Sequence, residues 1–143
     1  MITNYLASVH LVALGEAWTV AKKSNLDLEK TFKGIAASSG NSFVHETESQ
    51  VILNGSYNIN FTMDLVLKDT GLFDDLAKKL NAPLEISPKV VEIFKDGQKK
   101  YGSRAWSSMI VKRMEDLNNI DFRAKGFPEE LVDNEPEEKG YEI

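Results

Sequence analysis

The chain has 143 residues, of which 42% are hydrophobic and 27% charged, a composition typical of one folded domain and not of a disordered segment. The formal net charge of −5 and the lack of a concentrated basic cluster argue against nucleic acid as the main partner, because phosphate binding needs clustered Lys and Arg. The absence of cysteine excludes disulfides, thiolate catalysis and Cys-ligated metal, and it fits the cytoplasmic location that we expect.

The first stretch, Met1–Ser24, predicts a long helix that is apolar on most of its circumference. One apolar face consists of Ile2, Leu6, Val9, Ala13, Ala17 and Val20, and a second face consists of Leu11, Leu14, Trp18 and Ala21. A helix of this kind is central, covered by its neighbours or by a partner subunit. The stretch has neither the basic flank of a signal peptide nor the purity of a membrane span, so we expect no membrane association.

This helix begins in mid-pattern, and we therefore expect that the chain has been cut from a longer protein. The alternative is a slightly shorter helix that is capped by Thr3. A narrow stripe of small or polar residues runs along the same helix and contains Asn4, Ser8, Gly15 and Thr19. The geometry of the stripe favours close packing on another backbone, and a role in lining a site stays open.

Two shorter helices are predicted next. Asp27 is placed to cap a helix over Leu28–Ser38, and Ser42 is placed to cap another that runs to about Leu53. Glu46 and Glu48 lie near the start of this second helix, where the helix dipole favours acidic side chains. The following segment, from Asn54 to Thr62, is predicted to be irregular.

Three further helices complete the predicted domain. The fourth covers Met63–Asn81, with an apolar face made of Leu65, Leu67, Leu72, Phe73, Leu76 and Leu80. Gly71 inside this helix costs about 1 kcal/mol relative to Ala, which suggests close contact with a neighbour. Ser87 and a proline at the first helical position predict a fifth helix over Pro88–Tyr101. The sixth is predicted over Ala105–Leu117.

The end of the chain has a different character. Residues 118–143 are acidic, contain prolines, and show no apolar periodicity, so they predict an irregular or disordered tail. No segment alternates in the way that a strand does. The sequence therefore predicts an all-α fold of about six helices around a long, apolar N-terminal helix, with an acidic C-terminal tail.

Few residues suggest chemistry by themselves. His10 and His45 are isolated, so no metal site is predicted. No glycine-rich phosphate loop is present. The pair Lys68-Asp69 does stand out, because burying charged groups in an apolar helix costs desolvation free energy unless they have partners or reach a cleft. The simpler interpretation is a lysine at the rim of the helix that extends its ammonium into water.

Several segments, taken in order, resemble the C-terminal domain of the 3-hydroxyisobutyrate dehydrogenase family of β-hydroxyacid dehydrogenases, relatives of 6-phosphogluconate dehydrogenase. The matching residues are Ile2-Thr3-Asn4, Glu16, Asn25-Leu26-Asp27, Ser38-Ser39-Gly40-Asn41-Ser42, Phe61 with Lys68-Asp69-Thr70-Gly71-Leu72, and a weaker match at Gly102-Ser103-Arg104-Ala105-Trp106-Ser107. The resemblance covers about residues 1–117 and leaves the acidic tail outside.

The resemblance implies an oxidoreductase that uses NAD or NADP and acts on a small 3-hydroxyacid or semialdehyde. The cofactor would be bound mainly by a Rossmann domain that this sequence does not contain. The catalytic lysine of the family aligns with the position before Met1, so the resemblance assigns no catalytic residue to this chain and implies that the fragment alone is inactive. It also implies a homo-oligomer.

The resemblance assigns roles to four residues. Asn4, Phe61 and Asp69 match positions that bind the substrate or line its site, and Lys68 matches a position that contacts the cofactor. Two departures, Thr3 in place of asparagine and Asn25 in place of glycine, leave the choice of substrate open. The alternative interpretation is a helical protein-interaction module without catalysis, and the genomic sequence upstream of Met1 would discriminate between the two.

Overall fold

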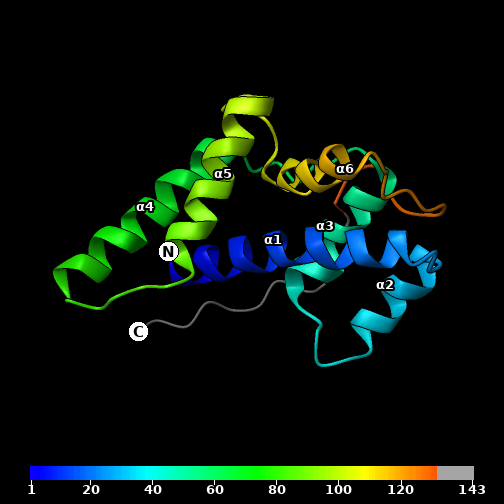
Figure 1. Cartoon of the computed structure of the whole chain (residues 1–143), viewed down its shortest axis with the longest axis horizontal. Helices are drawn as coiled ribbons and strands as arrows, with labels where there is room; N and C mark the ends of the chain where they lie inside the picture. Colours follow the sequence, from blue (N-terminus) through cyan, green and yellow to red (C-terminus); the bar gives the residue numbers. More distant parts are fainter. Residues whose placement is uncertain (132–143) are drawn as a thin grey trace.

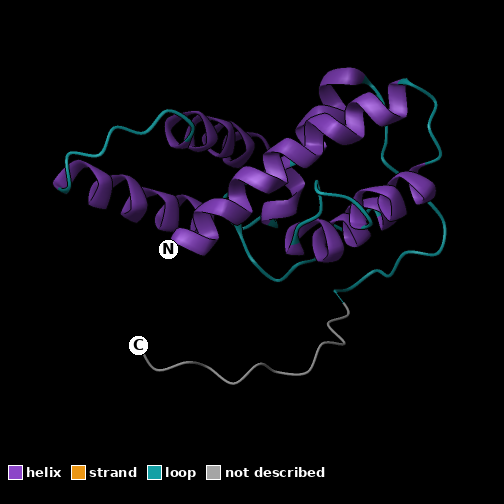
Figure 2. Ribbon diagram, turned by 90° about the horizontal axis from the view of Figure 1, so that it is seen from below, coloured by secondary structure: helices purple, strands orange, loops and turns teal. Residues whose placement is uncertain are grey.

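The structure, a computed structural model, describes residues 1–131 and is built from helices (Figure 1). The helices are α1 (Ile2–Lys23), α2 (Leu28–Ala36), α3 (Phe43–Asn54), α4 (Met63–Lys79), α5 (Ser87–Tyr101), the short 3-10 helix η1 (Ser107–Ile110) and α6 (Lys112–Asn118). Within the described residues there is no strand, only one isolated antiparallel bridge between Thr62 and Trp106 (Figure 2). The predicted all-α class is confirmed.

Helix α1 runs through the middle of the molecule and contacts every other helix. The paired helices α4 and α5 lie beside its N-terminal end, whereas α2, α3 and α6 lie along the rest of its length (Figure 1). Leu11, Leu14 and Trp18 are buried in the core, while Ile2 and Val20 are 62% and 66% exposed. Of the two predicted apolar faces of α1, only the second is therefore buried by the described residues.

The stripe of small residues on α1 serves packing along most of its length. A Cβ atom added to Gly15 would lie 3.4 Å from the Met114 side chain and 3.5 Å from the Val111 backbone, which shows how closely α6 approaches α1. Ser8 and Thr19 are buried on the same stripe, and their hydroxyls donate to backbone carbonyls one turn earlier in α1. Asn4, at the upstream end, has a different partner.

The predicted inward face of α4 is only partly correct. Leu72 and Leu80 are 53% and 68% exposed, and the buried residues of the helix are Met63, Val66, Thr70 and Ala77. Helix α4 packs on α5 and α1, and the described residues leave several of its leucines uncovered. The expected close contact at Gly71 is wrong, because nothing in the described structure lies within 4 Å of a Cβ atom built there.

Two of the predicted helix caps are confirmed and one is wrong. The Asp27 side chain accepts a hydrogen bond from the Lys30 amide at 3.0 Å, and the Ser42 hydroxyl accepts one from the His45 amide at 3.0 Å. Ser87 does not cap α5, because the helix already includes it. Its buried hydroxyl donates instead to the Asp74 carboxylate of α4.

The predicted sixth helix is divided into η1 and α6, and Ala105 is not helical. The backbone before η1 pairs with the segment that precedes α4. The Met63 amide donates to the Ala105 carbonyl at 3.0 Å, and the Ser107 amide donates to the Phe61 carbonyl at 2.8 Å. These long-range hydrogen bonds replace the helical ones, and they fix the position of Phe61.

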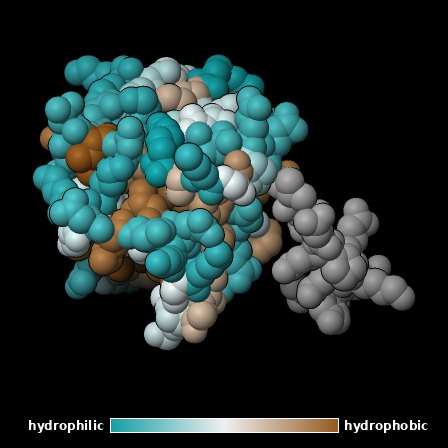
Figure 3. Space-filling view, turned by 90° about the vertical axis from the view of Figure 1, so that its right-hand side faces the viewer, coloured by the Kyte–Doolittle hydropathy of each residue, from teal (hydrophilic) through white to brown (hydrophobic). Residues whose placement is uncertain are grey.

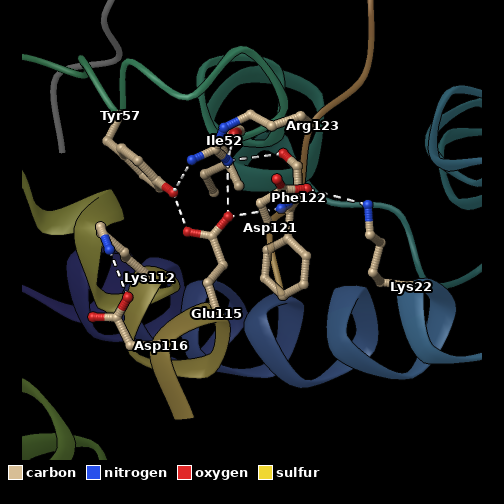
Figure 4. A network of polar contacts seen from close by, with 9 residues as sticks. All are labelled: Lys22, Ile52, Tyr57, Lys112, Glu115, Asp116, Asp121, Phe122 and Arg123. Carbon is tan, nitrogen blue, oxygen red and sulfur yellow. Dashed lines mark hydrogen bonds and ion pairs between the residues drawn. The ribbon is translucent and has the colours of Figure 1, made fainter. Parts of the chain in front are cut away.

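The segment after α6, residues 119–131, has no regular secondary structure but packs on the helices. Phe122 is fully buried, and the Glu115 carboxylate accepts hydrogen bonds from the Phe122 amide at 2.7 Å and from Arg123 at 2.8 Å. The Tyr57 hydroxyl donates to the same carboxylate (Figure 4). The rest of the predicted acidic tail, residues 132–143, lies outside the described residues.

Candidate functional site

Three of the four predicted site residues meet where α1 and α4 come together. The Asn4 side-chain amide donates to Asp69 Oδ2 at 2.5 Å, across 65 positions of sequence. The Lys68 ammonium lies 3.8 Å from Asp69 Oδ1. The Asp69 side chain is 19% exposed and that of Lys68 is 64% exposed, so the carboxylate is largely enclosed while the ammonium reaches solvent.

The hydrogen bond to Asp69 fixes the orientation of the Asn4 carboxamide, whereas the Lys68 ammonium stays exposed to solvent. Because the Asp69 carboxylate accepts from the Asn4 Nδ2 group, it sets the direction in which the carboxamide points. A neighbouring aromatic contact holds the same two helices together, since Tyr5 and Phe73 stack with their ring centroids 4.3 Å apart. An exposed ion pair such as Lys68–Asp69 adds little to the stability of the fold. The Lys68 ammonium reaches solvent, so it is able to contact an anionic group outside the chain.

The fourth predicted residue, Phe61, lies on a cavity that Asn4 also lines. The cavity has a volume of about 740 Å³ and lies between α1, α3 and the segment before α4. Most of its wall is apolar and includes Leu11 and Val44. Lys68 and Asp69 are not part of this wall. The structure therefore places Asn4 between two neighbourhoods, the charged pair on α4 and the apolar cavity with Phe61.

Glu48 also lines the cavity. From the sequence we expect only that its charge is favourable near the start of the helix. Its Oε2 atom is buried and has no hydrogen-bond partner among residues 1–131, and burial raises the pKa of the carboxyl to about 8. The sequence does carry a signal for this enclosure, because position 48 lies on the same helical stripe as Val44 and Ile52, both of which are buried.

His45 is a structural residue in the core. Its Nε2 atom lies 2.9 Å from the Phe32 carbonyl oxygen and its Nδ1 atom 3.1 Å from the Ser49 hydroxyl. Burial lowers the pKa of the imidazole, so the neutral form is favoured. The described residues contain no group of three or more His, Asp or Glu side chains arranged to hold a metal ion. No helix in residues 1–131 is both long enough and apolar enough to cross a membrane.

Curated relatives of the chain include dehydrogenases of small hydroxyacids. The L-threonate dehydrogenase of Haemophilus influenzae is 29% identical over 112 residues, which cover 78% of this chain and 37% of the relative. The 2-(hydroxymethyl)glutarate dehydrogenase of Eubacterium barkeri is 29% identical over 121 residues, or 84% of this chain and 40% of the relative. The chain thus spans about two fifths of the length of the relatives that it matches.

Solved structures show the same fold. A 3-hydroxyisobutyrate dehydrogenase from Salmonella typhimurium matches with a TM-score of 0.72 and 28% identity, over 78% of this chain and 39% of that one. The 3-hydroxyisobutyrate dehydrogenase of Mycobacterium tuberculosis, solved with L-serine, matches in fold with a TM-score of 0.71 and 21% identity, over 79% of this chain and 41% of that one.

The family match covers most of the helical domain. Residues 1–114 match the family described as NAD-binding of NADP-dependent 3-hydroxyisobutyrate dehydrogenase. This range contains α1 to α5, η1 and all four predicted site residues. The chain belongs to the 3-hydroxyisobutyrate dehydrogenase family.

Proposed function

We propose that this chain is the C-terminal helical domain of an NAD(P)-dependent oxidoreductase that acts on a small 3-hydroxyacid or semialdehyde. In that enzyme it closes the substrate cleft and forms the interface between subunits. We assign residues 1–117 to the domain and residues 118–143 to an acidic tail, the first part of which, residues 119–131, packs against the helices. The observation that carries the proposal is the Asn4–Asp69 hydrogen bond with Lys68 beside it, because it joins three residues that the family resemblance picks out independently.

The geometry supports a distinct role for each residue. The family's catalytic lysine aligns one helical turn before Asn4, at the end of α1 that α4 approaches, so Asn4 is placed to orient the hydroxyl and carboxylate of a substrate. Asp69 positions the Asn4 amide, and Phe61 supplies an apolar wall. The Lys68 ammonium, exposed beside them, is placed to contact the negatively charged cofactor, which supplies or accepts the hydride when bound.

A kinetic comparison in the full-length enzyme tests these roles. Lys68→Ala should raise the KM for NAD(P)H and leave kcat less affected, because it removes an interaction that is present equally in the ground and transition states. Asn4→Ala should instead impair the use of the carbonyl substrate. Lys68→Arg should restore the cofactor KM only in part, since a planar guanidinium does not reproduce a compact ammonium.

The stability of the same variants provides the control. As an exposed residue, Lys68 should contribute less than about 0.5 kcal/mol to the free energy of unfolding, so a kinetic effect of Lys68→Ala would not come from unfolding. Unchanged kinetics of Lys68→Ala toward both cofactor and substrate would reduce Lys68 to a surface lysine. Unchanged kinetics of Asn4→Ala would remove the basis of the proposed function.

A further inference from the structure

The cavity that Asn4 and Phe61 share has the dimensions of a site for a small organic molecule. Its volume of about 740 Å³ lies inside the range of roughly 300 to 1,000 Å³ that is typical of ligand pockets. Side chains of α1, α3 and α5 form its wall together with the segment before α4, and most of the wall surface is apolar. In the proposed function Asn4 orients the reacting end of the substrate, so the apolar part of the cavity is left for the rest of that molecule.

Several hydrogen-bond donors of this wall are already used within the chain. The Ser8 and Thr47 hydroxyls each donate at 2.7 Å to the backbone carbonyl four residues earlier. The side-chain amide of Asn41 donates to Glu46 Oε1 at 2.6 Å. A ligand whose buried part carries hydroxyl or amide groups would find few partners for them here, and burying polar groups without partners is unfavourable. The wall therefore favours a ligand with an apolar body.

Leu131 adds an apolar side chain to the wall from a segment that lies beyond residues 1–114, the range of the family match. Hydrogen bonds from the region where α3 ends fix the backbone just before Leu131. The Asn54 side-chain amide donates to the Phe127 carbonyl at 3.0 Å, and the Ser56 hydroxyl donates to the Glu129 carbonyl at 2.6 Å. The position of Leu131 on the wall is therefore set by the fold, although the family resemblance assigns it no role.

We propose that the side chain of the hydroxyacid or semialdehyde substrate is an apolar group of several carbons, and that it packs on Phe61 and Leu131 in this cavity. The inference rests on the proposed function and deepens it, because it names the class of substrate side chain and a residue that determines specificity. Glu48 on the same wall does not oppose the anionic end of such a substrate. Burial raises the pKa of its carboxyl to about 8, so the group is protonated and uncharged at neutral pH.

Kinetics of the full-length enzyme, in which the nucleotide-binding half precedes this chain, test the proposal. The substrates are three 3-hydroxypropanoates that carry a methyl, an isobutyl or a carbamoylmethyl group on the carbon next to the carboxylate. The isobutyl and carbamoylmethyl groups have nearly the same shape, so this pair separates polarity from size. For oxidation by NAD(P)+, kcat/KM of the isobutyl acid should exceed that of each other acid at least about tenfold, because only the isobutyl group buries several carbons without burying a polar group.

Two variants at Leu131 locate the contact. Leu131→Asn keeps the shape of the side chain but makes it polar, and it should reduce the ratio of kcat/KM for the isobutyl and carbamoylmethyl acids at least about threefold. Leu131→Ala should reduce the ratio for the isobutyl and methyl acids by a similar factor, because the longer group loses apolar contact surface. Leu117→Asn and Leu117→Ala, the same changes at an exposed leucine outside the cavity, should leave both ratios unchanged.

The outcomes separate this inference from the proposed function. Oxidation of all three acids with no preference for the isobutyl acid would overturn the inference and leave the proposed function standing. Ratios that both Leu131 variants leave unchanged would do the same. No oxidation of any of the three acids would overturn both.

Discussion

At the scale of single residues, Glu48 and His45 show that burial acts in opposite directions on acids and bases. Both lie on α3, and in both cases desolvation disfavours the charged form. For the Glu48 carboxyl this raises the pKa, and for the His45 imidazole it lowers the pKa. His45 has two hydrogen-bond partners and is satisfied when neutral, whereas Glu48 Oε2 finds no partner in the described part of the chain.

The dependence of stability on pH follows from the raised pKa of Glu48. Because its pKa rises from 4.5 to about 8 on folding, the folded chain binds more protons than the unfolded chain between these values. The cost of burying the carboxyl is absent below pH 4.5, grows as the pH rises, and is complete above about pH 8. Glu48→Gln should therefore stabilise the fold by about 1 to 3 kcal/mol at pH 9 and by little at pH 4.

Urea unfolding of the native chain and of Glu48→Gln at the two pH values measures this difference. The comparison isolates Glu48 from His45, because the imidazole is present in both chains and its own effect, a loss of stability as the pH falls below about 6.5, cancels. Equal effects of the substitution at pH 4 and pH 9 would mean that the Glu48 carboxyl is solvated in the folded chain.

At the scale of elements, α1 and α4 each keep an apolar surface that the described residues do not cover. On α1 it includes Ile2, Leu6 and Val20, and on α4 it includes Leu72 and Leu76. Figure 3 views the end of the molecule that carries α2 and the C-terminal end of α1, away from α4, and it shows an apolar area framed by hydrophilic side chains. Exposed apolar areas of this kind are typical of surfaces that pack against another protein unit.

We expect the chain to associate through the outward face of α1. Sedimentation at tens of micromolar should show an oligomer, because burial of this face removes apolar surface from water. Val20→Glu should shift the equilibrium toward the monomer. Leu117→Glu is the matched control, since it places the same charge at an exposed apolar residue outside α1 and should leave association unchanged. A native chain that stays monomeric at this concentration would contradict the expectation.

At the scale of the whole molecule, the helices bring together Asn4, Lys68 and Asp69, which we propose belong to a dehydrogenase site. The chain spans about two fifths of its relatives, and the described residues contain no strand from which a Rossmann sheet is built. We therefore expect the purified chain to show no reduction of semialdehydes by NAD(P)H. The same chain, when preceded by the nucleotide-binding half and the lysine of the longer enzyme, should be active. Steady turnover by the 143-residue chain above a blank would contradict this.

The sequence by itself determined the features that depend on neighbours along the chain. Apolar spacing of three and four residues specified the helices, and the caps at Asp27 and Ser42 marked where two of them begin. The order of motifs such as Ser38-Ser39-Gly40-Asn41-Ser42 identified the family, and it selected Asn4 and Lys68 without reference to any contact. These signals are local, so they could be predicted before the helices were placed in space.

Only the tertiary structure decided the features that depend on segments far apart. The backbone pairing of Phe61 with Ser107 divided the predicted sixth helix, and close packing left Leu72 of α4 outside. The hydrogen bond between Asn4 and Asp69 and the enclosure of Glu48 likewise required several helices to meet. A periodic pattern indicates which side chains of a helix are apolar, but it does not indicate which other helix covers them. That choice depends on the free energy of packing all the helices together.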